Sequence, residues 1–224
     1  MPNPYFLSTS TTPKSVTQPV DVYLQGTEDF LIPLVFPDYE ITVDEEQQKS
    51  FLGFSFTEKI KIPLLGHAGV LLVNGETGLT KYYEYGRYRN ATPPGIVRKG
   101  ALPDCKIVNG QISETSLKKV LKKISADHGH SGNISGVVLR GDFFDEALLW
   151  LKEKVAENDL PTRAPYELYT HNCMTFVIDL ADHLELDPSW KPPVVVPTAY
   201  MEQFQLTEID LEYFFETDAL EVSD

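Results

Sequence analysis

Cysteine is scarce in this 224-residue chain, which contains only Cys105 and Cys173. Two cysteines cannot form a disulfide framework or a cysteine-rich zinc site, although a single bridge between them is chemically possible. The chain also lacks an apolar run long enough to span a membrane, and its first residues lack the basic segment and apolar core of a signal peptide. We therefore expect free thiols and a protein that is cytoplasmic in the producing cell.

Positively charged residues are also few. The chain has 19 Lys and Arg residues and 33 Asp and Glu residues, which gives a formal net charge of −14. A chain of this charge is poorly suited to follow a phosphate backbone or to bind an anionic lipid surface. We therefore expect neither nucleic acid nor a membrane as partner. The hydrophobic share of 42% and the charged share of 23% are those of an ordinary globular protein with a sizeable core.

Metal ligands are few as well. His128 and His130, in "ADHGHSGN", could hold a metal ion together with a carboxylate. However, Gly, Ser and Asn surround them, and this composition is more typical of a solvated turn. We therefore expect no metal and no cofactor.

The residue pattern predicts strands in the first half of the chain. Strands are expected at 20–26, at 29–43 and within 51–88, and the prolines of the second suit an edge strand or a bulge. Within the third stretch, "NGETG" supplies the Asn and Gly residues that a hairpin turn needs. Residues 89–112 are predicted to be a loop.

The second half of the chain is predicted to be mainly helical. Helices are expected at 113–127 and at 142–158, the latter with Asp142 as its N-cap, and a short apolar strand lies between them at 134–141. A further helix is expected to begin near Cys173. Strands followed by helices, with one strand among the helices, indicate an α+β fold.

The segment "YTHNCMTFVIDLADHL" places one of the two cysteines at the start of an amphipathic helix. Cys173, Val177, Leu180 and Leu184 share one face of this helix. One interpretation is a small buried packing residue, which is the commoner role of a free cysteine. The other is a nucleophile whose thiolate is stabilised by the positive end of the helix.

A catalytic cysteine needs a base, and His67 is the most suitable of the five histidines. It opens a predicted strand and precedes two small residues, Ala68 and Gly69, which leave room for another element such as a helix tip. The structural alternative is an ordinary hydrogen-bonded histidine in a strand.

The hairpin suggests a residue that orients the imidazole of His67. If the turn is centred on Glu76, His67 pairs with Tyr85, and Glu84 or Tyr82 lies beside it. Glu84 and Tyr85 point to opposite faces, so only one of them can serve, and a register shift of one residue decides which.

These segments resemble parts of the NlpC-like, papain-fold cysteine amidases. The stretch "GHAGVLLVNGETG…YYEYGRY" resembles their histidine strand and hairpin, and "HNCMTFVIDLA" resembles the nucleophile helix of the circularly permuted branch. His67 precedes Cys173, as in that branch, which also includes lecithin:retinol acyltransferase-like enzymes. The paired segments cover about forty residues and are most similar to bacterial type VI secretion effectors of the TseH type.

The resemblance implies a permuted papain-like fold in which a sheet carrying the histidine packs against a helix carrying the cysteine. It implies that Cys173 is the nucleophile, His67 the general base and Glu84 the third catalytic residue, with Tyr85 in reserve. The amide N–H of Cys173 would serve the oxyanion, with Asn172 or a nearby side chain next to the second donor. The remaining residues expected to line the substrate cleft are Tyr169 and His171.

The same resemblance divides the chain into a permuted papain-like catalytic domain at 51–190 and two flanking segments. Residues 1–50 would form a leader and strands packed on the core. Residues 191–224 would form a Pro-rich and acidic extension that is able to dock as a strand or helix.

The expected function is cleavage of amide bonds in peptidoglycan peptides by an antibacterial effector. Its expected partners are the peptidoglycan substrate, an immunity protein and a secretion-machine carrier, with delivery to the periplasm of a target cell. Two alternatives remain open. One is a permuted papain-fold enzyme with another acyl chemistry, such as lipid acyl transfer or removal of a peptide modifier. The other is a non-enzymatic binding module in which His67 and Cys173 lie far apart.

Overall fold

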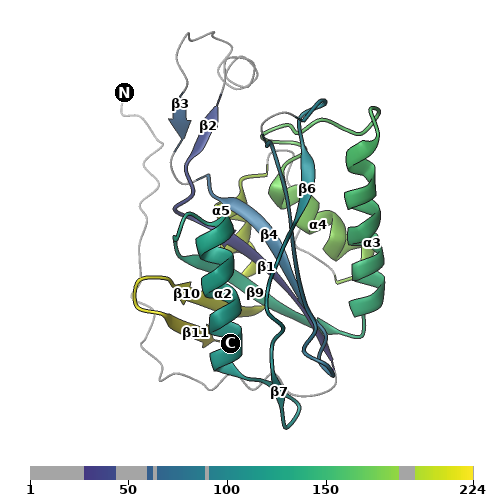
Figure 1. The fold of residues 1–224 in the computed structure, drawn as a ribbon. Helices are drawn as coiled ribbons and strands as arrows, with labels where there is room; N and C mark the ends of the chain where they lie inside the picture. Colours follow the sequence, from purple (N-terminus) through teal and green to yellow (C-terminus); the bar gives the residue numbers. More distant parts are fainter. Residues whose placement is uncertain (1–27, 44–59, 63–64, 89–90, 187–194, 224) are drawn as a thin grey trace, which may run out of the picture.

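A seven-stranded antiparallel sheet forms the centre of the molecule (Figure 1). The computed structural model describes residues 28–43, 60–62, 65–88, 91–186 and 195–223. The strand order is β11 (Ala219–Ser223), β10 (Ile209–Phe214), β9 (Ile134–Gly141), β1 (Asp29–Phe36), β4 (His67–Val73), β5 (Thr80–Gly86), β6 (Ile96–Gly100). Two short antiparallel strand pairs lie outside this sheet, β2 (Ile41–Val43) with β3 (Ile60–Ile62) and β7 (Ile107–Val108) with β8 (Gln111–Ile112). The strands predicted at 20–26 and in the first part of 51–88 fall largely outside the described residues.

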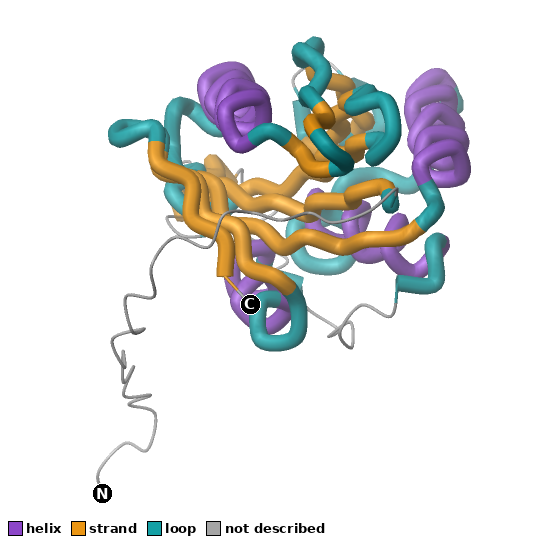
Figure 2. Tube along the Cα trace, turned by 90° about the horizontal axis from the view of Figure 1, so that it is seen from below, coloured by secondary structure: helices purple, strands orange, loops and turns teal. Residues whose placement is uncertain are grey.

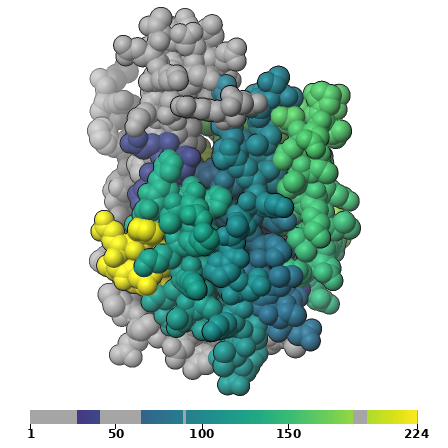
Figure 3. Space-filling model, in the orientation of Figure 1, coloured from purple at the N-terminus to yellow at the C-terminus, as the bar shows by residue number. Residues whose placement is uncertain are grey.

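Helices cover both faces of the sheet, as Figure 2 shows. One face packs on α2 (Glu114–His128) through an apolar row on this helix, which is Leu117, Val120, Leu121 and Ile124. The other packs on α3 (Phe144–Ala156), α4 (Cys173–His183) and α5 (Pro197–Phe204). In Figure 3, α2 and α3 form much of the visible surface, with the C-terminal strands in yellow beside α2. The predicted α+β class is confirmed.

Strand β1 lies between β4 and β9, at the centre of the sheet. Its prolines had suggested an edge strand or a bulge. The edge position is wrong, and the register to β9 is the same on both sides of Pro33, so no residue bulges there. The ladder from β1 to β4 is continuous through Pro33, whereas the ladder from β1 to β9 is interrupted at Ile32 and Pro33. Proline has no N–H to donate, so a central strand tolerates it only where one ladder is already broken.

The N-terminus of α3 is held by a residue far away in the sequence. Asp142 had been predicted as the N-cap, but no side chain caps this helix locally. Instead, Oδ2 of Asp29 accepts hydrogen bonds from the backbone N–H groups of Phe143 and Phe144, at 3.2 and 2.8 Å. The other oxygen of Asp29 accepts from Asn74 and Gly75 in the β4–β5 turn. The start of β1 thus ties the hairpin to α3.

The sheet also extends beyond the predicted catalytic segment. The division at residues 50 and 190 leaves β1, β10 and β11 outside that segment, although all three are hydrogen-bonded into the sheet. The predicted loop at 89–112 contains the edge strand β6, which pairs with β5. This strand, "IVRKG", is too short and too polar to stand out from its own sequence.

Candidate active site

Cys173 is the first residue of α4, as the sequence predicts, and its side chain is buried. The preceding Asn172 is the N-cap, and its Oδ1 accepts the backbone N–H groups of Met174 and Thr175. Its Nδ2 donates to the carbonyls of Leu168 and Val195, at 2.7 and 2.8 Å. Both amide donors are therefore occupied, so Asn172 holds the helix start and has no side-chain donor left for an oxyanion.

His67 is the first residue of β4 and is only 7% exposed. Gly66 before it has a φ of +71°, and a side chain there would contact Thr198, so the turn into the strand requires glycine. The imidazole stacks with Phe36, with ring centroids 6.2 Å apart. The start of the strand is thus fixed by its backbone and by its neighbours.

Cys173 and His67 lie side by side. Their side chains are within hydrogen-bonding distance, although 106 residues separate them in the sequence. Burial lowers the pKa of His67, but the charge and hydrogen bond of Cys173, together with Glu84, outweigh it and raise the pKa to about 10. A thiolate and an imidazolium stabilise each other in this arrangement. The alternative of a binding module with His67 and Cys173 far apart does not agree with this geometry.

Glu84 holds the other side of the imidazole. Its Oε2 lies 3.2 Å from Nε2 of His67, which leaves Nδ1 for the sulfur. The carboxylate also accepts the hydroxyls of Tyr82 at 3.0 Å and Tyr88 at 2.6 Å, and Nδ1 of His128 at 3.1 Å. Burial raises the pKa of this carboxyl, but the histidine and tyrosine donors together hold it well below its ordinary value of 4.5. Glu84 is therefore ionised at neutral pH.

The register of the hairpin determines that Glu84, and not Tyr85, faces His67. The turn at 74–78 forms as predicted, but Glu84 pairs with Gly69, one residue away from the predicted pairing of His67 with Tyr85. The predicted register is therefore wrong by one residue, and the shift moves Glu84 onto the face of His67 and Gly69. Tyr82 fills the space over Gly69, where a Cβ would contact its ring, so Gly69 makes room for a tyrosine. Ala68, the other small residue of the prediction, faces the core that contains Cys173 at the start of α4.

Two tyrosines that the sequence analysis missed complete the site. Tyr166 hydrogen-bonds to Cys173, and burial next to that sulfur raises the pKa of its hydroxyl well above the ordinary value. Tyr39 lies over the imidazole of His67, with ring centroids 5.2 Å apart, and stacks on His130 at 4.4 Å. Both tyrosines come from connecting segments without a periodic pattern, so no signal in the sequence singles them out.

Two of the residues predicted to line the cleft, Tyr85 and His171, lie together beside Tyr166, the tyrosine that contacts Cys173. Tyr85 packs against Tyr166 and His171, with ring centroids 5.5 and 5.2 Å apart. Tyr85 and His171 line a pocket of about 160 Å³ between α3, α4 and the β5–β6 edge. Tyr169 lies apart from this pocket, where it packs on the small cluster formed by Leu65 and Leu168.

Among the residues that the structure describes, no group of three His, Cys, Asp or Glu side chains has the geometry of a metal site. No helix in this described part is long and apolar enough to cross a membrane. The chemistry that the arrangement offers is that of a thiolate, an imidazole and a carboxylate in series.

Comparisons with known proteins agree with this geometry. A family model described as "Type VI secretion system effector TseH-like" matches residues 31–185. The crystal structure of a type VI secretion system effector, TseH, is similar with a TM-score of 0.78 and 55% sequence identity, over 89% of this chain and 100% of that one. A search of curated protein sequences found no match. The fold is a permuted papain-like α+β fold, and the chain belongs to the TseH-like family of type VI secretion system effectors.

Proposed function

We propose that this protein is a cysteine hydrolase that cleaves an amide bond in peptidoglycan peptides and acts as an antibacterial effector. The observation that carries the proposal is the series Cys173, His67 and Glu84, in which each side chain hydrogen-bonds to the next. The three residues come from α4, β4 and β5. A thiol, an imidazole and an orienting carboxylate in this order are the parts of a nucleophilic acyl-transfer site.

In the first step, the thiolate of Cys173 attacks the amide carbonyl carbon, and a C–S bond forms. The carbonyl oxygen becomes an oxyanion, and the imidazolium of His67 then protonates the leaving nitrogen. The C–N bond breaks, the amine departs, and a thioester remains on Cys173. In the second step, neutral His67 takes a proton from water, the hydroxide attacks the thioester, and the thiolate is released.

The start of α4 supports the charged species of both steps. The side chain of the cap residue Asn172 accepts hydrogen bonds from the N–H groups of Met174 and Thr175. The N–H of Cys173 is not used by this cap and is therefore the donor in this turn that can serve an oxyanion. The hydroxyl of Tyr166 hydrogen-bonds to the sulfur and so stabilises the thiolate before a substrate enters. Glu84 keeps Nδ1 of His67 aimed at the sulfur.

The pocket next to the site favours a peptide over a lipid acyl chain. Its lining combines the aromatic rings of Tyr85, Trp150 and Phe176 with charged side chains of both signs, among them Lys154 and Asp179. A lipid acyl chain requires an apolar groove, because charged groups lose hydration when they are covered by hydrocarbon. Peptide groups can instead satisfy charged and polar partners.

A substrate reaches Cys173 only after a covering side chain moves, because Cys173 is fully buried and His67 nearly so. Tyr166 contacts the sulfur and Tyr39 covers the imidazole, so these two rings are the ones to be displaced. As a secreted effector, the protein would require a carrier for delivery to the periplasm of the target cell and an immunity protein in the producer. An immunity protein that seals this entrance would block the site without touching the nucleophile.

Purified peptidoglycan is the direct substrate for a test. We expect the protein to release soluble peptide fragments with new amine termini, detected by mass spectrometry, and Cys173→Ala to release none. Periplasmic expression of the unchanged protein in a sensitive bacterium should lyse the cells, and expression of Cys173→Ala should not. Cys105→Ala is the matched control, because this second buried thiol lies in the core on the α2 side of the sheet and should not affect cleavage.

Two results would contradict the proposal. The first is intact peptidoglycan after prolonged incubation with folded protein, and the second is undiminished toxicity of a folded Cys173→Ala variant. Circular dichroism of each variant establishes that it is folded.

A further inference from the structure

The carboxylate of Glu84 is held by more groups than a catalytic series needs. Each oxygen accepts two donors, Oε2 from His67 and Tyr82 and Oε1 from Tyr88 and His128. His67, Tyr82 and Tyr88 come from the β4–β5 hairpin or the residues directly after it. His128 differs, because it is the last residue of α2 and belongs to the helix that covers the opposite face from α4.

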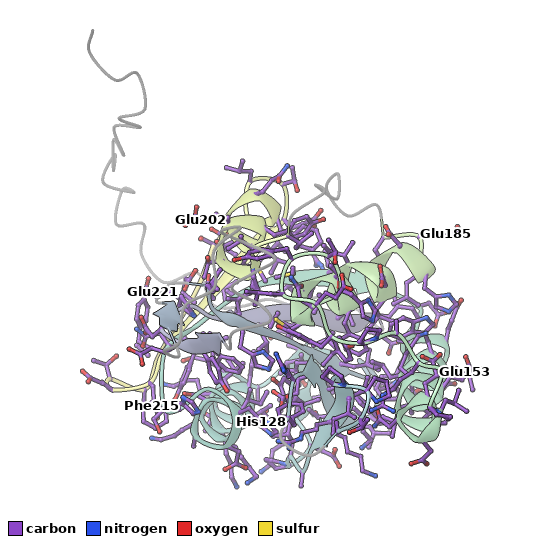
Figure 4. All side chains as sticks on the ribbon, turned by 90° about the horizontal axis from the view of Figure 1, so that it is seen from above. His128, Glu153, Glu185, Glu202, Phe215 and Glu221 are labelled. Carbon is purple, nitrogen blue, oxygen red and sulfur yellow. The ribbon has the colours of Figure 1, made fainter. Side chains whose placement is uncertain are left out.

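The environment of His128 fixes its ring. Figure 4 shows this residue between α2 and the sheet. Its ring centroid lies 4.8 Å from that of Tyr82, and a side chain on Gly100 would collide with Nε2. The side chain is 15% exposed, and Nδ1 is the nitrogen that faces Glu84. The ring therefore has one orientation in which it can donate to the carboxylate.

We propose that His128 is a positioning residue, which donates from Nδ1 to Oε1 of Glu84 and so keeps the other carboxylate oxygen aimed at His67. The inference rests on the proposed function of Cys173 and His67. The donor belongs to α2, which lies on the face of the sheet opposite α4 and its Cys173. A helix outside the nucleophile's side of the sheet therefore controls the orientation of the catalytic imidazole. His128 acts through Glu84 and touches neither the sulfur nor the substrate carbonyl.

The electrostatic effect of His128 acts in the same direction. Its hydrogen bond is the strongest of the interactions that lower the pKa of Glu84 against the opposing effect of burial. The titratable and charged groups that face this carboxylate are His67 from β4, Tyr82 from β5, Tyr88 after it, Arg98 from β6, His128 from α2 and Tyr39, whose hydroxyl interacts with the charge of Glu84. Without His128, the carboxyl becomes protonated at a higher pH, and His67 loses its anionic partner there.

Two substitutions separate the hydrogen bond from the packing of the ring. His128→Phe keeps an aromatic ring against Tyr82 but has no donor, whereas the amide nitrogen of His128→Asn can replace Nδ1. We expect His128→Phe to lower kcat for peptidoglycan about tenfold with KM within about twofold, and His128→Asn to recover most of that loss. His183→Phe is the control, because this histidine is exposed on α4 and pairs with Glu146.

A second measurement is independent of the substrate. NMR titration of the labelled imidazole of His67 measures its pKa in each variant. Because Glu84 is one of the groups that raise the pKa of His67, we expect this pKa to fall by about one unit in His128→Phe and to stay in place in His128→Asn and His183→Phe.

The outcomes are distinct. A folded His128→Phe variant with an unchanged pKa of His67 overturns the inference, as does a shift of equal size in His128→Asn. If the unmodified protein leaves peptidoglycan uncut, the proposed function fails, and the titration of His67 still decides whether His128 holds Glu84.

Discussion

At the scale of single residues, Glu84 is the side chain whose burial demands the most compensation. It is 3% exposed, and an ionised carboxylate in such a place is strongly destabilising unless donors surround it. Four donors meet this demand, and two of them are histidines. The same contacts that make the charge tolerable also aim it at His67, so stability and orientation have one physical origin.

Replacing Glu84 by Gln keeps the shape but removes the charge. We expect kcat to fall about a hundredfold or more, since the imidazolium that forms during the reaction loses its partner. The lowered pKa of Glu84 means that its stabilising contribution is present above its ordinary pKa of 4.5 and is lost as the pH falls. Urea unfolding at a series of acid pH values should therefore show that the free energy of unfolding falls more steeply with decreasing pH in the unmodified protein than in Glu84→Gln. Equal dependence on pH in the two proteins would contradict this prediction.

The raised pKa of His67 gives a prediction in the alkaline range. With a pKa of about 10, the ring stays protonated well above neutral pH, and its stabilising contribution is complete below 6.5 and lost as the pH rises through about 10. In Cys173→Ala the negative partner is missing while burial remains, so the pKa of His67 should fall. NMR titration of the labelled imidazole measures this shift directly. An unchanged pKa of His67 in folded Cys173→Ala would contradict this prediction.

At the scale of elements, the start of α4 positions the nucleophile through its cap. Asn172→Ala removes the acceptor for two helical N–H groups and leaves the buried carbonyls of Leu168 and Val195 without a donor. We expect a loss of about 2–4 kcal/mol in the free energy of unfolding. Asn172→Ser retains a capping oxygen and should lose less. Urea unfolding measures both, and equal losses would show that the cap contributes nothing.

The start of α3 provides a matched comparison of two aspartates. Asp29→Ala deprives two N–H groups of α3 and two donors of the hairpin turn of their acceptor, so we expect a loss of about 2–3 kcal/mol. The exposed Asp142, which local sequence rules favour as the cap, should change the free energy of unfolding by less than about 0.5 kcal/mol when replaced by Ala. Thermal unfolding of the two variants compares the remote cap with the local one. A larger loss of stability in Asp142→Ala than in Asp29→Ala would refute Asp29 as the cap.

At the scale of the whole molecule, the C-terminal strands complete the sheet. Leu211 and Tyr213 of β10 are buried in the core under α2, and β10 pairs with β9. Removal of residues 207–224 would expose this core and leave β9 as an open edge. We expect the truncated chain to lose cooperative unfolding. Near-ultraviolet circular dichroism, recorded during thermal unfolding, measures this loss. Leu206→Ala, at a side chain that is 82% exposed, should leave unfolding unchanged. A truncated chain that unfolds cooperatively would mean that these strands are dispensable.

The sequence by itself determined the local elements and the order of the chemistry. Alternation and turn residues predicted the β4–β5 hairpin, and apolar spacing predicted α2 and the helix that begins at Cys173. These signals are readable because each depends on neighbours within about one or two turns or one hairpin. The appearance of His67 before Cys173 also indicated the permuted arrangement.

Tertiary structure alone decided the contacts between distant segments. It set the one-residue register that places Glu84 beside His67, and it brought Asp29 to α3 and Tyr166 to the sulfur. It also placed His128 on Glu84, from α2, the helix that covers the face opposite α4. Such contacts join residues that are tens of positions apart, and packing of the two helical layers onto one sheet selects among registers that the local pattern leaves nearly equal.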